Sequence, residues 1–249
     1  MGSMRLIGAL CLALCGMAWA GEDAVVPPPE KQDPLTPERG YFKDYPHAWN
    51  NFHKFFLERA AQGDVAVLFI GDSLTQGWND QKDLWKKEYE PLKAANFGIG
   101  GDRTQQVLWR ITNGELEGLK PKVVVLMIGV NNIWPNDPPD RIGAGIKKIV
   151  ETVREKRPQT KVLVLGVLPS GKNATDSLRE RIKQINAVAA KLDDGKTVRF
   201  LDLGVKFLES DGSLAPEKYF KADFLHLRPR GYEVWADGMR ELLTEMLKP

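Results

Sequence analysis

The stretch VAVLFIGDSL, residues 65–74, decides the fold of this chain. Its first six residues are apolar without interruption, which suits a β-strand that is buried on both faces, as in a parallel sheet. Gly71 and Asp72 then end the apolar run. The pattern therefore predicts that Ser73 stands at the carboxyl end of a buried strand, where a helix opens.

Four further apolar runs repeat this signal, and helical patterns separate them. The runs are 95–98, 123–128, 162–167 and 198–203, and the helical patterns are 103–113, 139–155, 177–193 and 229–247. A further helix is expected over 47–61. Alternating strands and helices predict an α/β fold: a three-layer α/β/α sandwich around a five-stranded, mostly parallel sheet. We expect one domain over residues 41–249.

The amino terminus has the pattern of a secretory signal peptide. Arg5 precedes twelve apolar residues, 6–17, and Ala18-Trp19-Ala20 offers a small-x-small cleavage site. The alternative, a membrane anchor, is disfavoured because twelve apolar residues are too few to cross a bilayer. Residues 1–20 are therefore interpreted as a signal peptide cut after about Ala20, and the mature protein is expected to be secreted or periplasmic.

Composition excludes several classes of partner and chemistry. Both cysteines, Cys11 and Cys15, lie in the signal peptide, so the mature chain has no cysteine nucleophile and no thiolate metal site. The net charge is only +2 and no basic run occurs, which gives no reason to expect nucleic acid as a partner. No second apolar run approaches the length of a membrane span, so stable membrane insertion is not expected. Residues 21–40 are rich in proline and are expected to form an extended leader.

Ser73 is the candidate nucleophile. Ligands of open parallel sheets bind beyond the carboxyl ends of the strands, which selects the loops 71–79, 98–104, 129–138 and 168–175. At a helix start, the backbone N–H of Ser73 can also face a developing oxyanion. The alternative is that Ser73 only caps the helix, a common use of serine.

His226 is the candidate base among three histidines. It follows Asp223 by three residues, a spacing that lets the carboxylate hold one ring nitrogen of the imidazole. Such a pair is more often structural than catalytic when taken alone. His47 and His53 lie in the amino-terminal helical segment, and we expect them to be surface or packing residues.

Two more loops carry candidate oxyanion donors. Residues 98–101, Gly-Ile-Gly-Gly, follow the second strand and leave backbone N–H groups open to a ligand. Asn131 follows the third strand, and its side-chain amide is a neutral donor suited to an oxyanion. For asparagine, the alternative is a turn or cap.

Together these residues resemble the GDSL, or SGNH, hydrolase family. The four family blocks match 71–74, 98–102, 129–131 and 223–226, and the resemblance covers residues 65–249. It implies a flavodoxin-like SGNH hydrolase fold and a serine esterase that needs no cofactor and no metal. It assigns Ser73 as nucleophile, His226 as base and Asp223 as its orienting carboxylate. The oxyanion donors it implies are the backbone N–H groups of Ser73 and Gly101 and the Asn131 side chain.

Within the family, several pieces look closest to the brain-type platelet-activating-factor acetylhydrolase catalytic subunits. These pieces are 96–102, 107–110, 113–116 and 223–227. Many family members have Asp after the third-block Asn, whereas this chain has Asn132, as in that branch. Subunits of the branch dimerise, and a homodimer therefore stays open, although no feature of the sequence requires it.

The substrate expectations rest on residues beside the motifs. Leu74, Val130 and Leu225 are expected to narrow the acyl pocket to acetyl, and Trp78 and Trp134 to offer ring faces to a sugar. We therefore expect deacetylation of a carbohydrate, as a small molecule or a polysaccharide. The alternatives are an acetylhydrolase or lysophospholipase activity on lipid and, from another class, a non-catalytic sugar-binding module.

Overall fold

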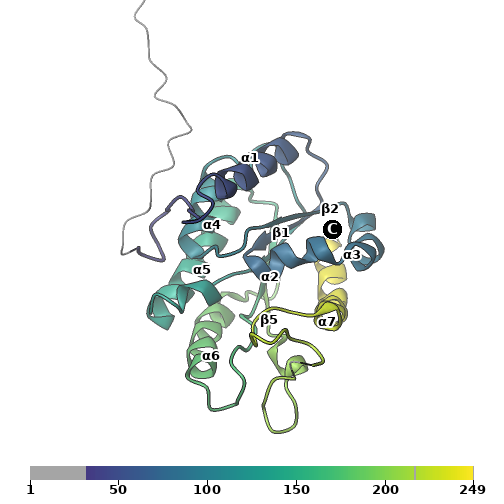
Figure 1. Ribbon diagram of the computed structural model, residues 1–249. Helices are drawn as coiled ribbons and strands as arrows, with labels where there is room; N and C mark the ends of the chain where they lie inside the picture. The colour runs from purple at the N-terminus through teal and green to yellow at the C-terminus, as the bar shows by residue number, and fades with distance from the viewer. Residues whose placement is uncertain (1–31, 216, 249) are drawn as a thin grey trace, which may run out of the picture.

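The computed structural model describes residues 32–215 and 217–248 (Figure 1). The expected signal peptide, 1–20, and the first part of the leader, 21–31, lie outside the described residues. The rest of the leader, 32–40, contains no helix or strand but is fixed to the domain. The Thr104 hydroxyl donates to the Pro34 carbonyl over 2.9 Å, and the Glu38 N–H donates to the Gln105 carbonyl over 3.1 Å.

The described residues form one five-stranded sheet in the order β2-β1-β3-β4-β5. The strands are β1 (Val67–Gly71), β2 (Ala94–Gly98), β3 (Val123–Met127), β4 (Lys161–Leu165) and β5 (Val198–Leu201). Every pairing is parallel, which confirms the expected five-stranded, mostly parallel sheet; no strand of this sheet is antiparallel. The element boundaries differ from the sequence expectations by a few residues at most.

Helices cover both faces of the sheet, which confirms the three-layer α/β/α sandwich (Figure 1). One face carries α1 (Ala48–Ala61), α4 (Thr104–Thr112), α5 (Pro139–Lys156) and α6 (Ser177–Ala189); the other carries α3 (Lys82–Glu88) and α7 (Pro229–Leu247). A short α2 (Ser73–Gln76) follows β1. The single-turn 3₁₀ helices are η1 (Gly77–Asp80), η2 (Glu90–Leu92), η3 (Val130–Asn132), η4 (Ala190–Leu192) and η5 (Gly204–Phe207).

Two cores result from the alternation of side chains along each strand. In β1, Leu68 and Ile70 face the core under α1, α4, α5 and α6, whereas Val67 and Phe69 face the core under α3 and α7. All four side chains are fully buried, which is why the sequence shows an unbroken apolar run rather than alternation.

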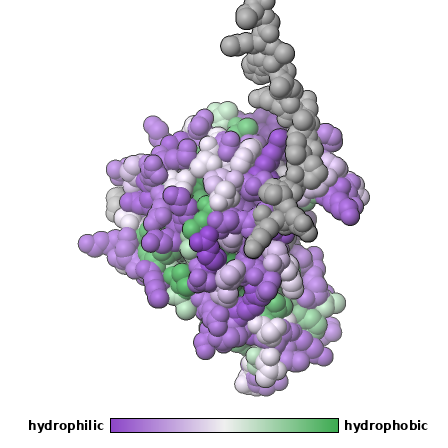
Figure 2. All heavy atoms as spheres, turned by 90° about the vertical axis from the view of Figure 1, so that its left-hand side faces the viewer, coloured by the Kyte–Doolittle hydropathy of each residue, from purple (hydrophilic) through white to green (hydrophobic). Residues whose placement is uncertain are grey.

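The face of the molecule shown in Figure 2 is mostly hydrophilic. Figure 2 shows the side of the molecule that carries α4, α5 and α6, where small apolar patches are separated by polar side chains. Within the described ranges, no helix combines the length and the apolarity that crossing a bilayer requires.

The register of the parallel strands brings the motif loops to one edge of the sheet. Gly71 at the end of β1 pairs with Gly98 at the end of β2 on one side and with Met127 at the end of β3 on the other. The loops that follow these three residues therefore leave the sheet side by side. They contain Ser73, Gly101 and Asn131.

Gly98 is required by the close approach of α2 to β2. A Cβ atom on Gly98 would lie 2.3 Å from the backbone nitrogen of Gln76 and 2.7 Å from the carbonyl carbon of Thr75. Backbone atoms of a helix cannot rotate away as a side chain can, so α2 itself would have to move.

We predict that Gly98→Ala lowers the free energy of unfolding by about 2 kcal/mol, because overpacking forces a backbone shift. The same shift displaces Ser73 at the start of α2, so esterase activity should fall as well. Urea unfolding and an ester-hydrolysis assay measure the two effects. An unchanged unfolding midpoint would contradict the close packing of α2 on β2.

Candidate active site

Ser73 is free to react because another residue caps its helix. Asp72 is the N-cap of α2, and its carboxylate accepts the Leu74 N–H over 3.0 Å. The Ser73 hydroxyl instead lies 2.9 Å from Nε2 of His226. The capping alternative for Ser73 is therefore wrong, since the capping position belongs to the residue before it.

His226 and Asp223 lie in a tight turn just before α7. The Asp223 carboxylate accepts from Nδ1 of His226 over 2.7 Å, and its other oxygen accepts the backbone N–H groups of Leu225 and His226, each over 3.0 Å. Phe224 takes a left-handed conformation, with φ of 54°, which folds the turn back on itself. Residues 153 apart in sequence, Ser73 and His226, are thus joined through one imidazole.

The electrostatics of this turn suit a general base. Partial burial acts to raise the pKa of Asp223, but the hydrogen bonds from the His226 ring and from two backbone N–H groups outweigh it and lower that pKa. An ionised Asp223 holds the proton of the neutral ring on Nδ1 and leaves Nε2 as an acceptor facing the serine hydroxyl. The arrangement can take a proton from Ser73 and stabilise the imidazolium that results.

The candidate oxyanion donors have open N–H groups. Among the described residues, no hydrogen-bond acceptor contacts the backbone N–H of Ser73 or of Gly101. Gly101 has φ of +80°, a conformation that favours glycine. The Asn131 amide donates one hydrogen to the Asp102 carbonyl over 2.9 Å, which orients the group and leaves its second N–H available. The oxyanion role of all three stays a prediction.

The structure accounts for Asn132, the departure from the family pattern. Its side chain is fully buried, and its carbonyl oxygen accepts the Thr104 N–H over 3.0 Å. Its amide nitrogen donates to Gln105 over 3.0 Å and to the Asp137 carboxylate over 2.9 Å. A carboxylate at this position could not donate and would repel Asp137, so this local network requires an amide.

A cavity of about 410 Å³ opens beside Ser73 and His226. The polar side chains that line it are those of Gln76, Asn79, Asp80, Gln81 and Lys221, and its apolar lining includes Leu227, Pro229 and Tyr232. A hollow of similar size between α6 and β5, about 430 Å³, contains none of the predicted catalytic residues. The first cavity is therefore the candidate substrate site.

The structure corrects part of the expected substrate contacts. Trp78 is only 1% exposed and packs against Tyr89, Tyr232 and Trp235, so the expectation that its ring meets a sugar is wrong. The η1 turn directs the indole into the core under α7.

The other four expected contacts differ in exposure. Leu74 and Val130 are each 2% exposed and belong to the two cores, so they lie beneath the site rather than at its surface. Leu225 is half-buried, and Trp134 is 57% exposed. These last two remain available for substrate.

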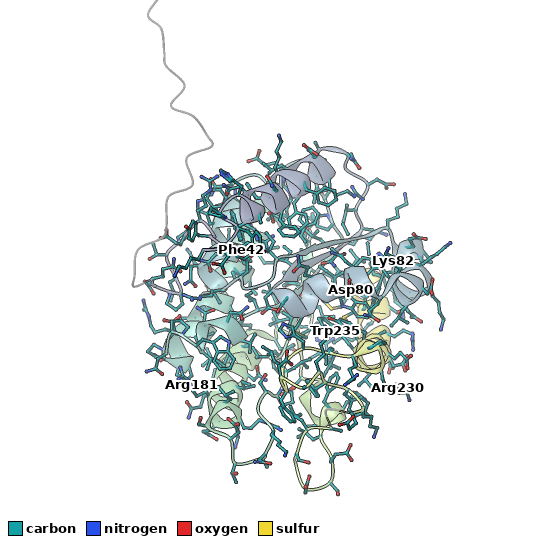
Figure 3. The ribbon with its side chains drawn as sticks, in the orientation of Figure 1. Phe42, Asp80, Lys82, Arg181, Arg230 and Trp235 are labelled. Atoms are coloured by element: carbon teal, nitrogen blue, oxygen red, sulfur yellow. The ribbon has the colours of Figure 1, made fainter. Side chains whose placement is uncertain are left out.

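Sequence reasoning missed Phe42 and the polar lining of the cavity. The Phe42 ring lies 3.6 Å from the position that a Cβ on Gly101 would take. Figure 3 shows Phe42 and Asp80 on opposite sides of α2, Phe42 toward α4 and Asp80 toward α3. No local motif marks either residue, because each reaches the site from a segment without a chemical signature.

The two remaining histidines lie outside the candidate site. His53 packs in α1 against Trp109 and contacts Glu115 over 3.0 Å, and His47 is exposed just before α1, as expected for both. Within residues 32–215 and 217–248, no three His, Asp or Glu side chains are grouped so that they could hold a metal ion.

Known proteins are similar to this chain over most of its length. The model of the GDSL-like lipase/acylhydrolase family matches residues 69–234. The human platelet-activating factor acetylhydrolase IB subunit alpha1 is 40% identical over 200 residues, which cover 80% of this chain and 84% of that protein.

Two solved structures share the fold at lower identity. A GDSL-like lipase from Bacteroides thetaiotaomicron superposes with a TM-score of 0.63 at 18% identity, covering 78% of this chain and 97% of the other. An acetylxylan esterase from Geobacillus stearothermophilus gives a TM-score of 0.58 at 21% identity, covering 74% and 96%.

The family match and the shared fold identify this protein as a carboxylic-ester hydrolase. The chain belongs to the GDSL-like lipase/acylhydrolase family, whose model covers more than half of it.

The carboxyl group before the nucleophile has an unusual environment. Complete burial, together with the nearby Asp102 carboxylate, raises the pKa of Asp72 to about 7, although the Leu74 N–H opposes this shift. Its Oδ2 atom has no hydrogen-bond partner among the described residues. A buried carboxyl with one unpartnered oxygen favours the neutral form.

We predict that wild-type stability falls from about pH 4 to pH 8 partly because of Asp72. A carboxyl whose pKa is about 7 when folded and near 3.8 when unfolded stabilises the fold at low pH, and this contribution is lost as pH rises through 7. The difference corresponds to at most about 4 kcal/mol. Asp72→Asn keeps the capping oxygen, so its unfolding free energy should depend less on pH. Urea unfolding at pH 5 and pH 8 measures this.

The exposed Asp44→Asn is the matched control for the loss of one carboxylate. It should follow the wild-type pH dependence. If Asp72→Asn also follows the wild-type curve, the neutral state of Asp72 is refuted.

Proposed function

We propose that this protein is an exported serine esterase that removes short acyl groups, chiefly acetyl, from carbohydrate. The observation that carries the choice of substrate is the polar lining of the cavity beside Ser73 and His226. Amide, carboxylate and ammonium groups there can exchange hydrogen bonds with the hydroxyls of a sugar, whereas a lipid tail would leave them unsatisfied.

The proposed chemistry is acyl transfer in two steps. Oγ of Ser73 attacks the ester carbonyl while Nε2 of His226 takes its proton, and Asp223 stabilises the imidazolium. The N–H groups of Ser73 and Gly101 and the Asn131 amide bind the oxyanion. Collapse of the tetrahedral intermediate expels the alcohol, which receives the proton from His226. Water then attacks the acyl-enzyme with His226 again as base, releasing the acid and the serine.

The acyl group is proposed to bind between three apolar side chains. Leu225 next to the base, Trp134 on the loop after β3, and Phe42 beside Gly101 each retain exposed area. Leu74 and Val130 would limit the depth of the site from beneath. Such a space suits acetyl better than long chains.

A lipid substrate is the second candidate. It is favoured by the 40% identity to a subunit that is named as a platelet-activating factor acetylhydrolase. The similarity to an acetylxylan esterase, at 21% identity, shows the fold alone and does not decide between the two substrates. A non-catalytic sugar-binding module is disfavoured because Ser73, His226 and Asp223 keep hydrogen-bonded contacts that a binding module does not need.

The proposal also includes export from the cytoplasm and assembly into a homodimer. The segment with Arg5, the apolar residues 6–17 and Ala18-Trp19-Ala20 supports cleavage after about Ala20 and a secreted or periplasmic location. A homodimer would follow from the likeness to the acetylhydrolase subunits, and no cofactor or metal is required by the proposed chemistry.

We predict that Ser73→Ala lowers the kcat for p-nitrophenyl acetate by at least about 10⁴-fold, because the nucleophile is gone. Asn131→Ala should lower kcat by about 10²–10³-fold through the loss of one oxyanion donor. Asn113→Ala is the control, since that amide bonds only within the end of α4. Steady-state kinetics decides. Wild-type rates in Ser73→Ala would refute the proposed mechanism.

We predict that the enzyme hydrolyses the acetyl esters of acetylated xylan or pectin faster than it hydrolyses an acetyl or longer acyl ester of a lipid. The substrates are compared at equal ester concentration with a coupled acetate assay and fatty-acid detection. Replacing Gln76 by Ala should raise KM for the acetylated sugar more than for p-nitrophenyl acetate. A clear preference for lysophospholipid would overturn the carbohydrate assignment.

A further inference from the structure

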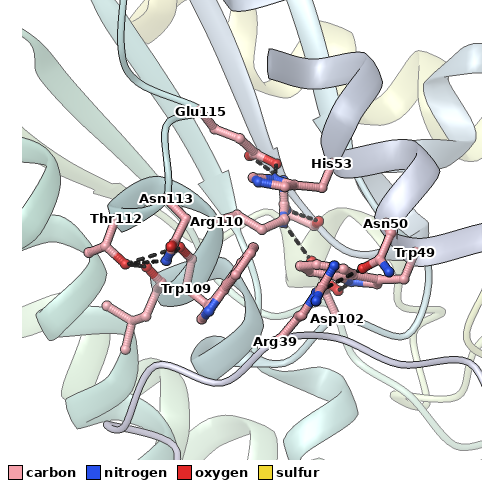
Figure 4. Close-up of polar contacts among 12 residues, drawn as sticks. Arg39, Trp49, Asn50, His53, Asp102, Trp109, Arg110, Thr112, Asn113 and Glu115 are labelled. Carbon is pink, nitrogen blue, oxygen red and sulfur yellow. Dashed lines mark hydrogen bonds and ion pairs between the residues drawn. The ribbon is translucent and has the colours of Figure 1, made fainter. Parts of the chain in front are cut away.

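A buried arginine lies beneath the candidate site. Arg110 on α4 is 0% exposed, and each of its three guanidinium nitrogens has an acceptor (Figure 4). Nε donates to Asp102 over 2.9 Å, Nη1 to Glu115 over 2.6 Å and Nη2 to the Gly71 carbonyl over 3.4 Å. The flanking groups are themselves held: Trp49 donates to Asp102 over 2.7 Å, and His53 contacts Glu115 over 3.0 Å.

Two of these acceptors belong to the loops that carry the proposed chemistry. Gly71 ends β1 two residues before Ser73, and Asp102 directly follows Gly101. The Asp102 carbonyl also accepts the Asn131 amide over 2.9 Å. The guanidinium therefore contacts Gly71, which precedes the candidate nucleophile by two residues, and Asp102, which follows Gly101 directly and accepts a hydrogen bond from Asn131.

The third acceptor leads away from the site. Glu115 lies beyond the end of α4, and its second oxygen contacts His53 in the middle of α1. The cluster thus has an inner arm, Asp102 and Gly71, and an outer arm, Glu115 and His53. The two arms share one charge and the same burial but differ in their distance from the chemistry.

Stability alone gives little reason for such a cluster. Desolvating buried ions costs about as much free energy as their pairing returns, so well-packed apolar residues would serve the core equally well. What a guanidinium adds is direction: its planar fork fixes several acceptors at set angles. Oxyanion stabilisation depends on donor positions to within a few tenths of an ångström.

We propose that Arg110 is a positioning residue that sets the spacing between the nucleophile turn and the oxyanion loop through Gly71 and Asp102. It does not touch the substrate, and the inference rests on the proposed function. Loss of the fork lets Gly101 and Asn131 shift relative to Ser73, which weakens binding of the transition state more than binding of the ester.

Three single variants test this in the full chain. Arg110→Lys keeps the charge but offers one ammonium where three directed donors stood. Asp102→Asn weakens the inner arm, and Glu115→Gln weakens the outer arm by an equally conservative change. The measurements are kcat and KM for p-nitrophenyl acetate, urea unfolding, and the inhibition constant of phenylboronic acid, which forms a tetrahedral adduct with a nucleophilic serine.

Arg110→Lys and Asp102→Asn should lower kcat about 10–100-fold, less than the about 10²–10³-fold expected when a donor is lost, because the donors are only displaced, with KM within about threefold. The inhibition constant for the boronic acid should rise in parallel. Glu115→Gln should destabilise the fold to a similar extent and yet keep kcat within about twofold. A purely structural role would move stability in all three variants and the kinetic constants in none.

The proposal is overturned if Glu115→Gln lowers kcat as much as Asp102→Asn, or if folded Arg110→Lys keeps the wild-type kcat and boronic-acid affinity. Should Arg110→Lys fail to fold, the comparison of Asp102→Asn with Glu115→Gln still separates the inner arm from the outer arm, and only Asp102→Asn should lower kcat. Wild-type protein that does not hydrolyse the ester would overturn the proposed function and this inference with it. Turnover that is insensitive to the inner arm refutes the inference alone.

Discussion

The site depends on the burial of a parallel sheet on both of its faces. Parallel hydrogen bonding in register aligns Gly71, Gly98 and Met127, so the segments that follow them must leave at one edge. Helices cover both faces of the sheet, so polar side chains on those faces would be buried in a core. At the carboxyl edge of the strands, polar groups can lie together without being buried. Ser73 and the loops with Gly101 and Asn131 are neighbours for that reason, although they are far apart in the chain.

Beneath that edge lies a group of buried ionisable side chains. Asp72, Asp102, Arg110 and Glu115 are all fully buried. Complete burial raises the pKa of Asp102 to about 7, even though Arg110 and Trp49 act to lower it. The free energy spent on desolvation is offset only where partners are well placed. The fold therefore accepts a cost in stability under the loops whose geometry matters most to the chemistry.

The residues on the substrate side of the site come from several separate segments of the chain. The cavity beside Ser73 and His226 is lined by residues of α2, η1, the turn before α7 and α7 itself. Phe42, by contrast, comes from the segment before α1, and the leader residues 32–40 are held on α4. The family match begins only at residue 69. Specificity in this chain can thus depend on a segment outside the part that defines the family.

Sequence patterns identified the strands and helices and the candidate reacting groups. The apolar runs identified all five strands, and Ser73, Asp223 and His226 stood out as the residue types that ester chemistry needs. The runs of β1, β3 and β4 are continuous because these strands are buried on both faces, whereas the runs of the edge strands β2 and β5 contain polar residues. The same patterns failed for Trp78. Whether a ring after a strand end meets solvent or the core depends on the direction of one 3₁₀ turn, which composition does not encode.

By itself, then, the sequence determined the order of strands and helices and the chemical groups at the strand ends, because both are local properties of the chain. Only the tertiary structure decided which groups meet. It brought Ser73 into contact with His226, 153 residues away, and Phe42 close to Gly101. It also buried the side chains of Trp78, Leu74 and Val130. Arg110 came to lie between two loops of the site. These relations depend on how α2, α4 and α7 pack on the sheet, and packing is fixed by the summed contacts of residues that lie far apart in the sequence.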